Sequence, residues 1–274
     1  MRGQVNGDDF GAGKTLPYAN GSLSHVKMTL DDYLYKFERA FLRTLVAKRM
    51  VPRIAGGAAT TNVIILDLEY PFPWVHPCEY GTLNASTLAA VVNATRLRVQ
   101  VIRELMPHAG IGLYSTVGCV SPSAQQGYLK AAALGLFDEI THLVPVMYMG
   151  AKTIATKLAH GALNASAQLT TTDGRQLQML PLLSWEESKK SGGKFYGCSL
   201  EVAKLHNLLG DIAAWDAAAP GGPGIVAAYV FWTPGDVGEV SAPGHDCGRN
   251  SPQESYEEWL HRARIVPSSC PHPR

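Results

Sequence analysis

Two carboxylates at the end of an apolar run carry the clearest chemical signal in this sequence. Residues 62–74 read NVIILDLEYPFPW, so Asp67 and Glu69 follow four consecutive apolar residues that are typical of a buried strand. Residues i and i+2 of a strand point to the same side, so we expect the two carboxylates to project together. Paired carboxylates are the usual catalytic groups for cleaving a glycosidic bond.

The spacing of the pair restricts the roles that each carboxylate can take. In two-carboxylate glycosidases the two groups lie across the scissile bond, about 5 to 9 Å apart, whereas Asp67 and Glu69 would approach a sugar from one side. Asp67 is therefore better placed to orient and polarise a group of the substrate, such as an N-acetyl carbonyl that acts as the internal nucleophile. Glu69 would be the general acid, its pKa raised by apolar surroundings and by the like charge of Asp67. The alternative is an acidic pair that caps the strand and bridges to a Lys or Arg of a neighbouring loop.

Aromatic and acidic residues also stand at the ends of the later expected strands. In chain order they are Tyr114, Tyr148, Trp185 with Glu186, and Trp232 with Asp236. Parallel α/β barrels gather their chemistry at the carboxyl ends of the strands, and aromatic faces stack on sugar rings, so we interpret Tyr114, Tyr148, Trp185 and Trp232 as substrate-binding residues. Two alternatives stay open. Tyr148 and Trp232 could be plain rim residues, and the segment SWEE could be a second carboxylate subsite or the acidic start of a helix.

Strand and helix patterns alternate along the chain. We expect strands at 62–69, 110–116, 142–148, 177–185 and 224–232, and helices at about 30–45, 86–106, 123–137, 151–166, 200–212 and 251–264, the last with Pro252 at its first position. Strands that are apolar on both faces and separated by helices predict an α/β fold with a parallel sheet, here a TIM-type (β/α) barrel. About five strong strands are fewer than the eight of a closed barrel, so either early strands lie in the weakly patterned first thirty residues or the opening units are missing.

Composition restricts the class of protein. The chain has 274 residues, 46% of them hydrophobic, which suits a single barrel domain over residues 1–274, with an irregular segment at 1–27 and a C-terminal helix and tail at 240–274. A net charge of +1 and the lack of a long Lys/Arg run argue against nucleic acid as a partner. No apolar run approaches the roughly 18 residues of a membrane span, so we expect none.

Sequons and the N-terminus bear on the cellular location. Four N-x-[ST] triplets, at Asn20, Asn84, Asn93 and Asn164, favour a secreted protein or the lumen of the endomembrane system. The first residues, MRGQVNGDDFGAGK, lack the apolar core of a signal peptide.

The five cysteines do not form a dense framework. Cys78, Cys119, Cys198, Cys247 and Cys270 allow at most two disulfides within the chain. Cys247 and Cys270, with His245 and His272 nearby, could bind a metal ion, but a disulfide or free thiols suits a loose tail better. We therefore predict no metal and no organic cofactor.

Several motifs and their order carry a family resemblance. VIILDLEYPFPW at 63–74 is followed by GLYSTVGC at 112–119, LVPVMYMG at 143–150 and GIVAAYVFW at 224–232, and is preceded by ANGSLSHVKMTLDDYLYKFERAF at 19–41. Together they resemble, in order, the D-x-E strand, the next strand end, the Pro-x-x-Tyr strand, the last strand and the preceding loop and helix of hyaluronidase-type glycosidases. Chitinase-like and muramidase-like barrels also carry D-x-E strands. The resemblance covers about residues 18 to 235.

The resemblance implies a retaining, substrate-assisted glycoside hydrolase acting on a polysaccharide or oligosaccharide that contains N-acetylhexosamine, such as hyaluronan. Glu69 would be the acid/base and Asp67 would position the acetamido group. Tyr114 and Tyr148 would hydrogen-bond around the reacting sugar, and Trp232 would wall its subsite. The chain departs from the family at Leu68, where hyaluronidases prefer Trp, and the first two family strands have no convincing counterpart. In that family Cys119 has a disulfide partner shortly after it, whereas the next cysteine here is Cys198.

Two other classes of function compete with the hydrolase. A catalytically inactive carbohydrate-binding barrel would keep the aromatic residues without turnover. A barrel enzyme for a phosphorylated metabolite is suggested by APGGPG at 219–224, just before the last strand. The segment GAGKT at 11–15 does not make a phosphate loop, because Asp8 stands where the pattern needs a glycine and no apolar strand precedes it.

Overall fold

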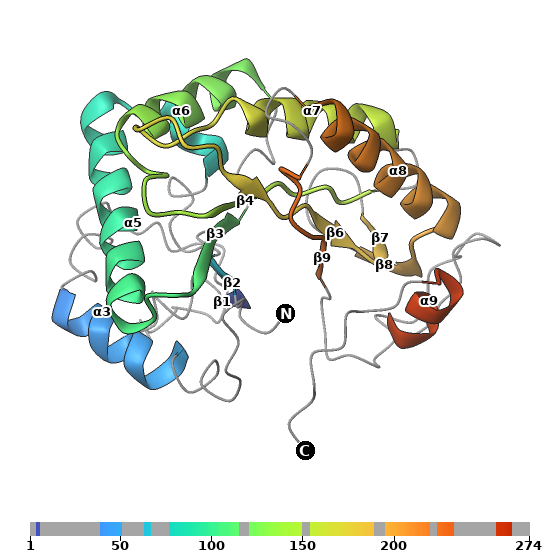
Figure 1. Ribbon diagram of the computed structural model, residues 1–274, viewed down its shortest axis with the longest axis horizontal. Coiled ribbons are helices and arrows are strands. Elements are labelled where there is room, and N and C mark those ends of the chain that lie inside the picture. The colour runs from blue at the N-terminus through green and yellow to red at the C-terminus, as the bar shows by residue number, and fades with distance from the viewer. Residues whose placement is uncertain are drawn as a thin grey trace, which may run out of the picture. The chain divides into compact units, whose positions relative to one another are not determined.

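The computed structural model describes residues 4–5, 39–50, 63–66, 77–114, 121–149, 154–188, 195–219, 224–232 and 256–264. They divide into two units, Met1–Val144 with Ala165–Met179 (unit 1) and Pro145–Asn164 with Leu180–Arg274 (unit 2). Figure 1 labels the elements. They are β1 (Gln4–Val5), α3 (Arg39–Leu45), the π-helix η2 (Val46–Met50), β2 (Val63–Leu66), the 3₁₀ helix η4 (Pro77–Thr82), α5 (Ala85–Leu105), β3 (Gly110–Tyr114), α6 (Pro122–Ala133), β4 (His142–Val144), α7 (Ala155–Ala167), β5 (Gln178–Met179), β6 (Leu182–Ser184), β7 (Glu186–Ser188), β8 (Phe195–Ser199), α8 (Val202–Ala218), β9 (Val230–Trp232) and α9 (Tyr256–Arg262).

Unit 1 is built on a parallel five-stranded sheet. Its strands follow chain order, β1-β2-β3-β4-β5, with Leu66 paired to Leu113 and Tyr114 paired to Val144. Ile64, Ile111 and Leu143 are fully buried and belong to the same core cluster as the apolar face of α5. The α/β class with parallel strands is therefore confirmed, because buried apolar side chains of the parallel strands β2, β3 and β4 share one core with those of a helix.

Helix α5 forms where its sequence supplies both a cap and an apolar stripe. The Asn84 side chain accepts a hydrogen bond of 2.9 Å from the Thr87 amide, which satisfies one of the unpaired donors of the first turn. Val91, Val92, Val99 and Ile102 turn into the core. The helix predicted at 86–106 is thus confirmed within a residue at each end.

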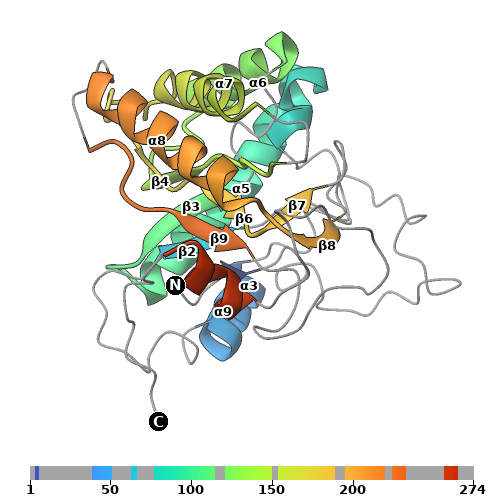
Figure 2. The same ribbon diagram turned by 90° about the vertical axis from the view of Figure 1, so that its right-hand side faces the viewer.

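Unit 2 contains two small sheets and a long covering helix. β6 and β9 are parallel, with Ser184 opposite Trp232, and Figure 2 shows them side by side. β7 and β8 form an antiparallel pair. α8 buries Leu205, Leu208 and Ile212, the positions expected from its helical periodicity.

Two expected strands are each divided at a proline. The strand predicted at 177–185 is wrong as one element, because β5 ends at Met179 and pairs with β4, whereas β6 begins at Leu182 and pairs with β9. Likewise β4 ends before Pro145, and Val146 forms a separate parallel bridge with Leu182. Proline has no amide hydrogen to donate, so a ladder is readily interrupted there.

The segment SWEE is not the start of a helix. Glu186 begins β7 and pairs with Ser199 of β8, so that alternative is wrong. Acidic residues suit the first turn of a helix, but here pairing with a strand further along the chain decides the conformation.

Early strand structure is present near the N-terminus. Gln4–Val5 forms β1, parallel to β2, so part of the first thirty residues does contribute to the sheet. The pairings among the described strands form sheets of five, two and two strands, and a closed barrel stays a prediction. None of the helices in the described ranges has the length and apolar character needed to cross a bilayer.

Candidate functional site

The D-x-E pair follows an inner strand of the unit 1 sheet. β2 lies between β1 and β3 and ends at Leu66, whose peptide bond leads directly to Asp67. Asp67 and Glu69 themselves lie outside the described residues. β2 is apolar and buried along its length apart from the half-buried Val63, as a central parallel strand should be.

Tyr114 occupies the corresponding place on the next strand. It is the last residue of β3, half-buried, and directly follows Leu113, the register partner of Leu66. Asp67 and Tyr114 are thus each the next residue after one register pair of neighbouring parallel strands. Tyr114, which we predicted to bind substrate, therefore lies at the carboxyl edge of the sheet, where (β/α) folds place their chemistry.

The chain returns from the D-x-E segment through η4, which is pressed tightly against α6. A Cβ added to Gly127 would lie 2.2 Å from the Gly81 backbone nitrogen, and one added to Gly81 would lie 2.0 Å from the Ser123 carbonyl oxygen. The rings of Tyr80 and Tyr128 meet edge to face with centroids 6.4 Å apart. Glycine at both positions allows this close approach, which fixes where the loop re-enters the fold.

A cysteine strengthens the same contact. Cys78, in η4, is disulfide-bonded, and the Tyr128 hydroxyl lies 3.9 Å from its sulfur and donates to it. The Cys247–Cys270 disulfide considered from the sequence lies outside the described residues, as do Cys119 and the side chain of Cys198.

Unit 2 places three predicted sugar-binding residues at the carboxyl ends of its strands. Trp232 is the last residue of β9, opposite Ser184, and Trp185 directly follows Ser184. Tyr148 is two residues beyond Val146, which bridges to Leu182, so Tyr148 and Ser184 stand at equivalent positions. Tyr148, Trp185 and Trp232 therefore lie at neighbouring backbone positions around the carboxyl end of β6.

The environment of Trp185 differs from that of a sugar-stacking platform. Its side chain is 3% exposed and its ring centroid lies 6.5 Å from that of Trp259. Trp259 in turn contacts Phe231 at 5.5 Å and donates a 2.9 Å hydrogen bond from Nε1 to the Leu200 carbonyl oxygen. Trp185 therefore belongs to the aromatic core beneath the strand ends. Trp259 is itself completely buried.

Most residues of the other chemistries considered from the sequence lie outside the described ranges. Within the described ranges, no three His, Cys, Asp or Glu side chains are grouped so that they could hold a metal ion. The segments with His245, Cys247, Cys270 and His272, the GAGKT segment and Asp236 lie outside those ranges. At the end of the APGGPG segment, the Gly224 amide donates a 2.9 Å hydrogen bond to the Asp216 carboxylate, and the Val226 amide, two residues further on, does the same. The Gly224 amide is therefore already bonded within the protein.

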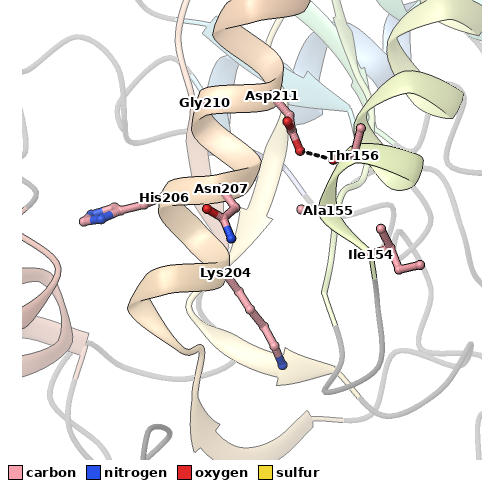
Figure 3. Close-up of a pocket in the computed structure, with 8 residues that line it drawn as sticks. All are labelled: Ile154, Ala155, Thr156, Lys204, His206, Asn207, Gly210 and Asp211. Carbon is pink, nitrogen blue, oxygen red and sulfur yellow. Dashed lines mark hydrogen bonds between the residues drawn. The ribbon is translucent and has the colours of Figure 1, made fainter.

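A hollow between α7 and α8 was not predicted from the sequence. It has a volume of about 510 Å³, and Figure 3 shows Thr156 of α7 facing Asp211 of α8 across it, joined by a 2.6 Å hydrogen bond. Lys204, Asn207 and Asp211 follow an i, i+3, i+7 spacing, which puts three polar residues on one face of α8. That stripe was readable in the sequence, but nothing in it indicated which helix lies opposite.

Comparisons with known proteins bear on the fold. No protein-family model matches the chain, and no curated protein matches it in sequence. The crystal structure of bee venom hyaluronidase in a monoclinic form superposes with a TM-score of 0.50 at 14% identity, covering 74% of this chain and 73% of that one. The likeness is one of fold. A second structure, of bee venom hyaluronidase in complex with a hyaluronic acid tetramer, gives a TM-score of 0.46 at 13% identity over 71% of this chain and 68% of that one.

The fold likeness agrees with the motif resemblance at a coarse level. The chain is a mixed α/β protein with parallel sheets whose structural neighbour is a hyaluronidase with a TIM barrel. At 14% identity this agreement concerns the path of the backbone.

Proposed function

We propose that this protein is a retaining, substrate-assisted glycoside hydrolase that cleaves a glycan containing N-acetylhexosamine, with hyaluronan as the leading candidate. The observation that carries the proposal is the position of β2. This strand is an inner, parallel strand of the unit 1 sheet and ends one residue before Asp67, next to a strand that ends at Tyr114. The hyaluronidase-like fold supports the same assignment.

In the proposed reaction the substrate supplies the nucleophile. Asp67 holds and polarises the acetamido group so that its carbonyl oxygen attacks the anomeric carbon. Glu69 donates a proton to the departing glycosidic oxygen, and the bond to the leaving sugar breaks. Glu69, now ionised, then takes a proton from water as the water opens the cyclic intermediate, so two displacements retain the anomeric configuration.

The predicted binding residues have separate roles in this proposal. Tyr114 hydrogen-bonds to the sugar from the end of β3. In unit 2, Tyr148 hydrogen-bonds to the sugar and Trp232 forms an apolar wall of a subsite. Since Trp185 is buried against Trp259, we assign it to sugar binding only through the support that it gives to the end of β6.

The decisive test compares Glu→Gln substitutions at two positions of unit 1. Reducing ends are measured after incubation with hyaluronan, chondroitin, chitin oligomers and peptidoglycan. We expect Glu69→Gln to lower kcat by about 10² to 10⁴-fold, because the change is nearly isosteric and removes the transferable proton. Glu79→Gln, at an exposed position of η4, is the matched control and should retain wild-type activity.

Three outcomes separate the hypotheses. Release by the wild type and by Glu79→Gln, with loss in Glu69→Gln, supports the proposal and identifies the glycan. Equal activity in all three proteins would show that Glu69 is not the acid. Saturable binding of a glycan by folded wild-type protein without any release would instead establish the inactive carbohydrate-binding barrel.

A glycan substrate outside the cytosol agrees with the proposed location. We propose that the protein is secreted or resides in the endomembrane lumen. Three of its sequons fall in the described ranges, and Asn84, Asn93 and Asn164 are all exposed, so the folded chain can carry glycans there. Peptide mass spectrometry after expression in a eukaryotic secretory system tests their occupancy.

A further inference from the structure

The hollow between α7 and α8 lies beside the strand ends of unit 2. The Leu200 amide donates a 2.6 Å hydrogen bond to the Trp185 carbonyl oxygen, and α8 begins two residues later at Val202. The first turn of α8 is therefore fixed next to the end of β6. Lys204 lies in that turn, whereas Asp211 lies about 10 Å further along the helix axis.

The lining of the hollow is amphipathic. Ile154, just before α7, is 66% exposed although it is a large apolar residue. Asn207 points into the space between the helices in Figure 3, and Lys204 extends toward its lower end. His206 points the other way, and its Nε2 lies 3.1 Å from the Ala263 carbonyl oxygen.

These groups suit one class of ligand. A sugar ring offers an apolar C–H face for Ile154 and hydroxyl groups for the Asn207 amide and the Asp211 carboxylate, whose Oδ2 already accepts from Thr156. An acidic sugar adds a carboxylate for Lys204. The volume of about 510 Å³ falls in the range of ordinary ligand pockets, roughly 300 to 1,000 Å³.

We propose that the α7–α8 hollow is a second saccharide-binding site, which holds an acidic sugar unit of the glycan through Lys204, Asn207 and Ile154. The choice of an acidic glycan rests on the proposed function, but binding in the hollow does not require turnover. The site would give a polymer a second point of attachment, so it favours long acidic chains over short ones.

The test is a binding measurement on protein that cannot degrade its ligand. In the Glu69→Gln background, calorimetric titrations with a hyaluronan decasaccharide and with the uncharged chitin hexamer are made at 20 mM and 500 mM NaCl. Lys204→Glu is compared with Lys157→Glu, a matched change at an exposed position of α7 that does not line the hollow. Asn207→Leu is a second variant that leaves the charge unchanged.

We expect Lys204→Glu to weaken decasaccharide binding by about five- to tenfold at 20 mM NaCl and by much less at 500 mM, because salt screens an accessible charge pair. Chitin hexamer binding should not respond to Lys204→Glu. Asn207→Leu should weaken both ligands at both salt concentrations. Thermal unfolding of each variant verifies that the comparison is made between folded proteins.

The results that overturn the site are distinct from those that overturn the hydrolase. Equal decasaccharide affinity of Lys204→Glu and Lys157→Glu, or no binding by the parent protein, would exclude an acidic-glycan site in the hollow. If wild-type protein releases no reducing ends but its binding depends on Lys204 and not on Lys157, the hydrolase proposal fails and the second site stands.

Discussion

The two ends of the unit 1 sheet are built differently. At the amino ends of β3 to β5, long side chains bind backbone carbonyl groups. Arg103 donates to the Ala109 and Glu139 carbonyl oxygens, the latter at 3.0 Å, and Arg175 donates to those of Asp138 and Ile140 at 3.0 and 3.2 Å. At the carboxyl ends, β2 leads into Asp67 and β3 ends at the half-buried Tyr114.

This difference divides stability from chemistry. Guanidinium groups that join several carbonyl oxygens fix the turns between helices and strands, and a change there should affect folding first. In (β/α) folds, residues at the carboxyl ends of the strands can be selected for a substrate. We therefore predict that substitutions at the amino ends of the strands lower stability and leave activity unchanged. Substitutions at the carboxyl ends should lower activity and leave stability unchanged.

The largest effect on stability should come from the close contact between Gly127 and η4, the helix that follows the D-x-E segment. In Gly127→Ala the new Cβ meets backbone atoms of Tyr80 and Gly81 that cannot rotate away, so we expect a loss of roughly 3 kcal/mol in the free energy of unfolding. Because η4 carries the return of the D-x-E loop, activity should fall as well. Urea denaturation and the reducing-end assay measure the two effects.

Gly210→Ala is the matched control for that change. Gly210 also lies inside a helix, but a Cβ there would meet no atom within 4 Å. The substitution should therefore stabilise the protein by about 0.5 to 1 kcal/mol, the ordinary helix propensity difference. If both variants were equally stable, close packing of η4 on α6 would not hold the loop in place.

Arg103→Met should cost about 2 kcal/mol in stability, because it removes charged hydrogen bonds to backbone carbonyl groups near the amino end of β3. Burial lowers the pKa of the Arg103 guanidinium, Glu139 opposes this by raising it, and Arg175 adds to the lowering. Arg96→Met is the control on the same helix, since Arg96 makes a single long contact of 3.5 Å to the Leu134 carbonyl. Activity per folded molecule should stay at the wild-type value, and a fall in kcat would contradict the division between the two ends.

Tyr114→Phe tests the carboxyl end in the opposite sense. Loss of one hydroxyl that contacts the reacting sugar should lower kcat/KM about tenfold, equivalent to about 1.4 kcal/mol. Thermal unfolding should change little, because the ring remains to fill its half-buried position in β3. A large drop in Tm with unchanged kcat/KM would show that Tyr114 is a packing residue.

The sequence predicted the elements that local pattern decides. The helical period predicted α5 almost to the residue, and runs that are apolar on both faces predicted β2 and β3. It missed what depends on distant partners. β1 has two residues, too few to show a period, and is a strand only because β2 pairs with it.

The site followed the same rule. The order of residues along the chain placed Tyr114 and Trp232 at strand ends, because parallel strands bring their carboxyl ends together. The sequence could not show that Trp185 is a buried core residue and not an exposed residue that stacks on a sugar. Trp185 packs against Trp259, which lies in a helix far along the chain. The polar stripe of α8 likewise indicated no binding site by itself, because the sequence did not show that α7 lies opposite it.

The smallest expected effect is a pH dependence at the amino end of β4. Burial lowers the pKa of His142, and a hydrogen bond with Gln178 opposes the shift. Thr141 Oγ1 lies 2.6 Å from its Nδ1. The unfolded chain therefore binds a proton at a pH where the folded chain does not, so stability is complete above about pH 6.5 and declines as the pH falls below that value, by at most ~1.4 kcal/mol per pH unit.

His142→Gln should flatten this decline and leave kcat/KM unchanged, because the residue lies at the opposite end of the sheet from Tyr114. Urea denaturation at pH 7.5, 6.5 and 5.5 measures the slope, with His160→Gln at an exposed position of α7 as the control. If the free energy of unfolding changed equally with pH in wild type and His142→Gln, His142 would not be the cause of the decline at acid pH. If His142→Gln lost activity but kept its full stability, the division between a stabilising amino end and a chemical carboxyl end of the sheet would be wrong, because a side chain at the amino end would then affect the chemistry.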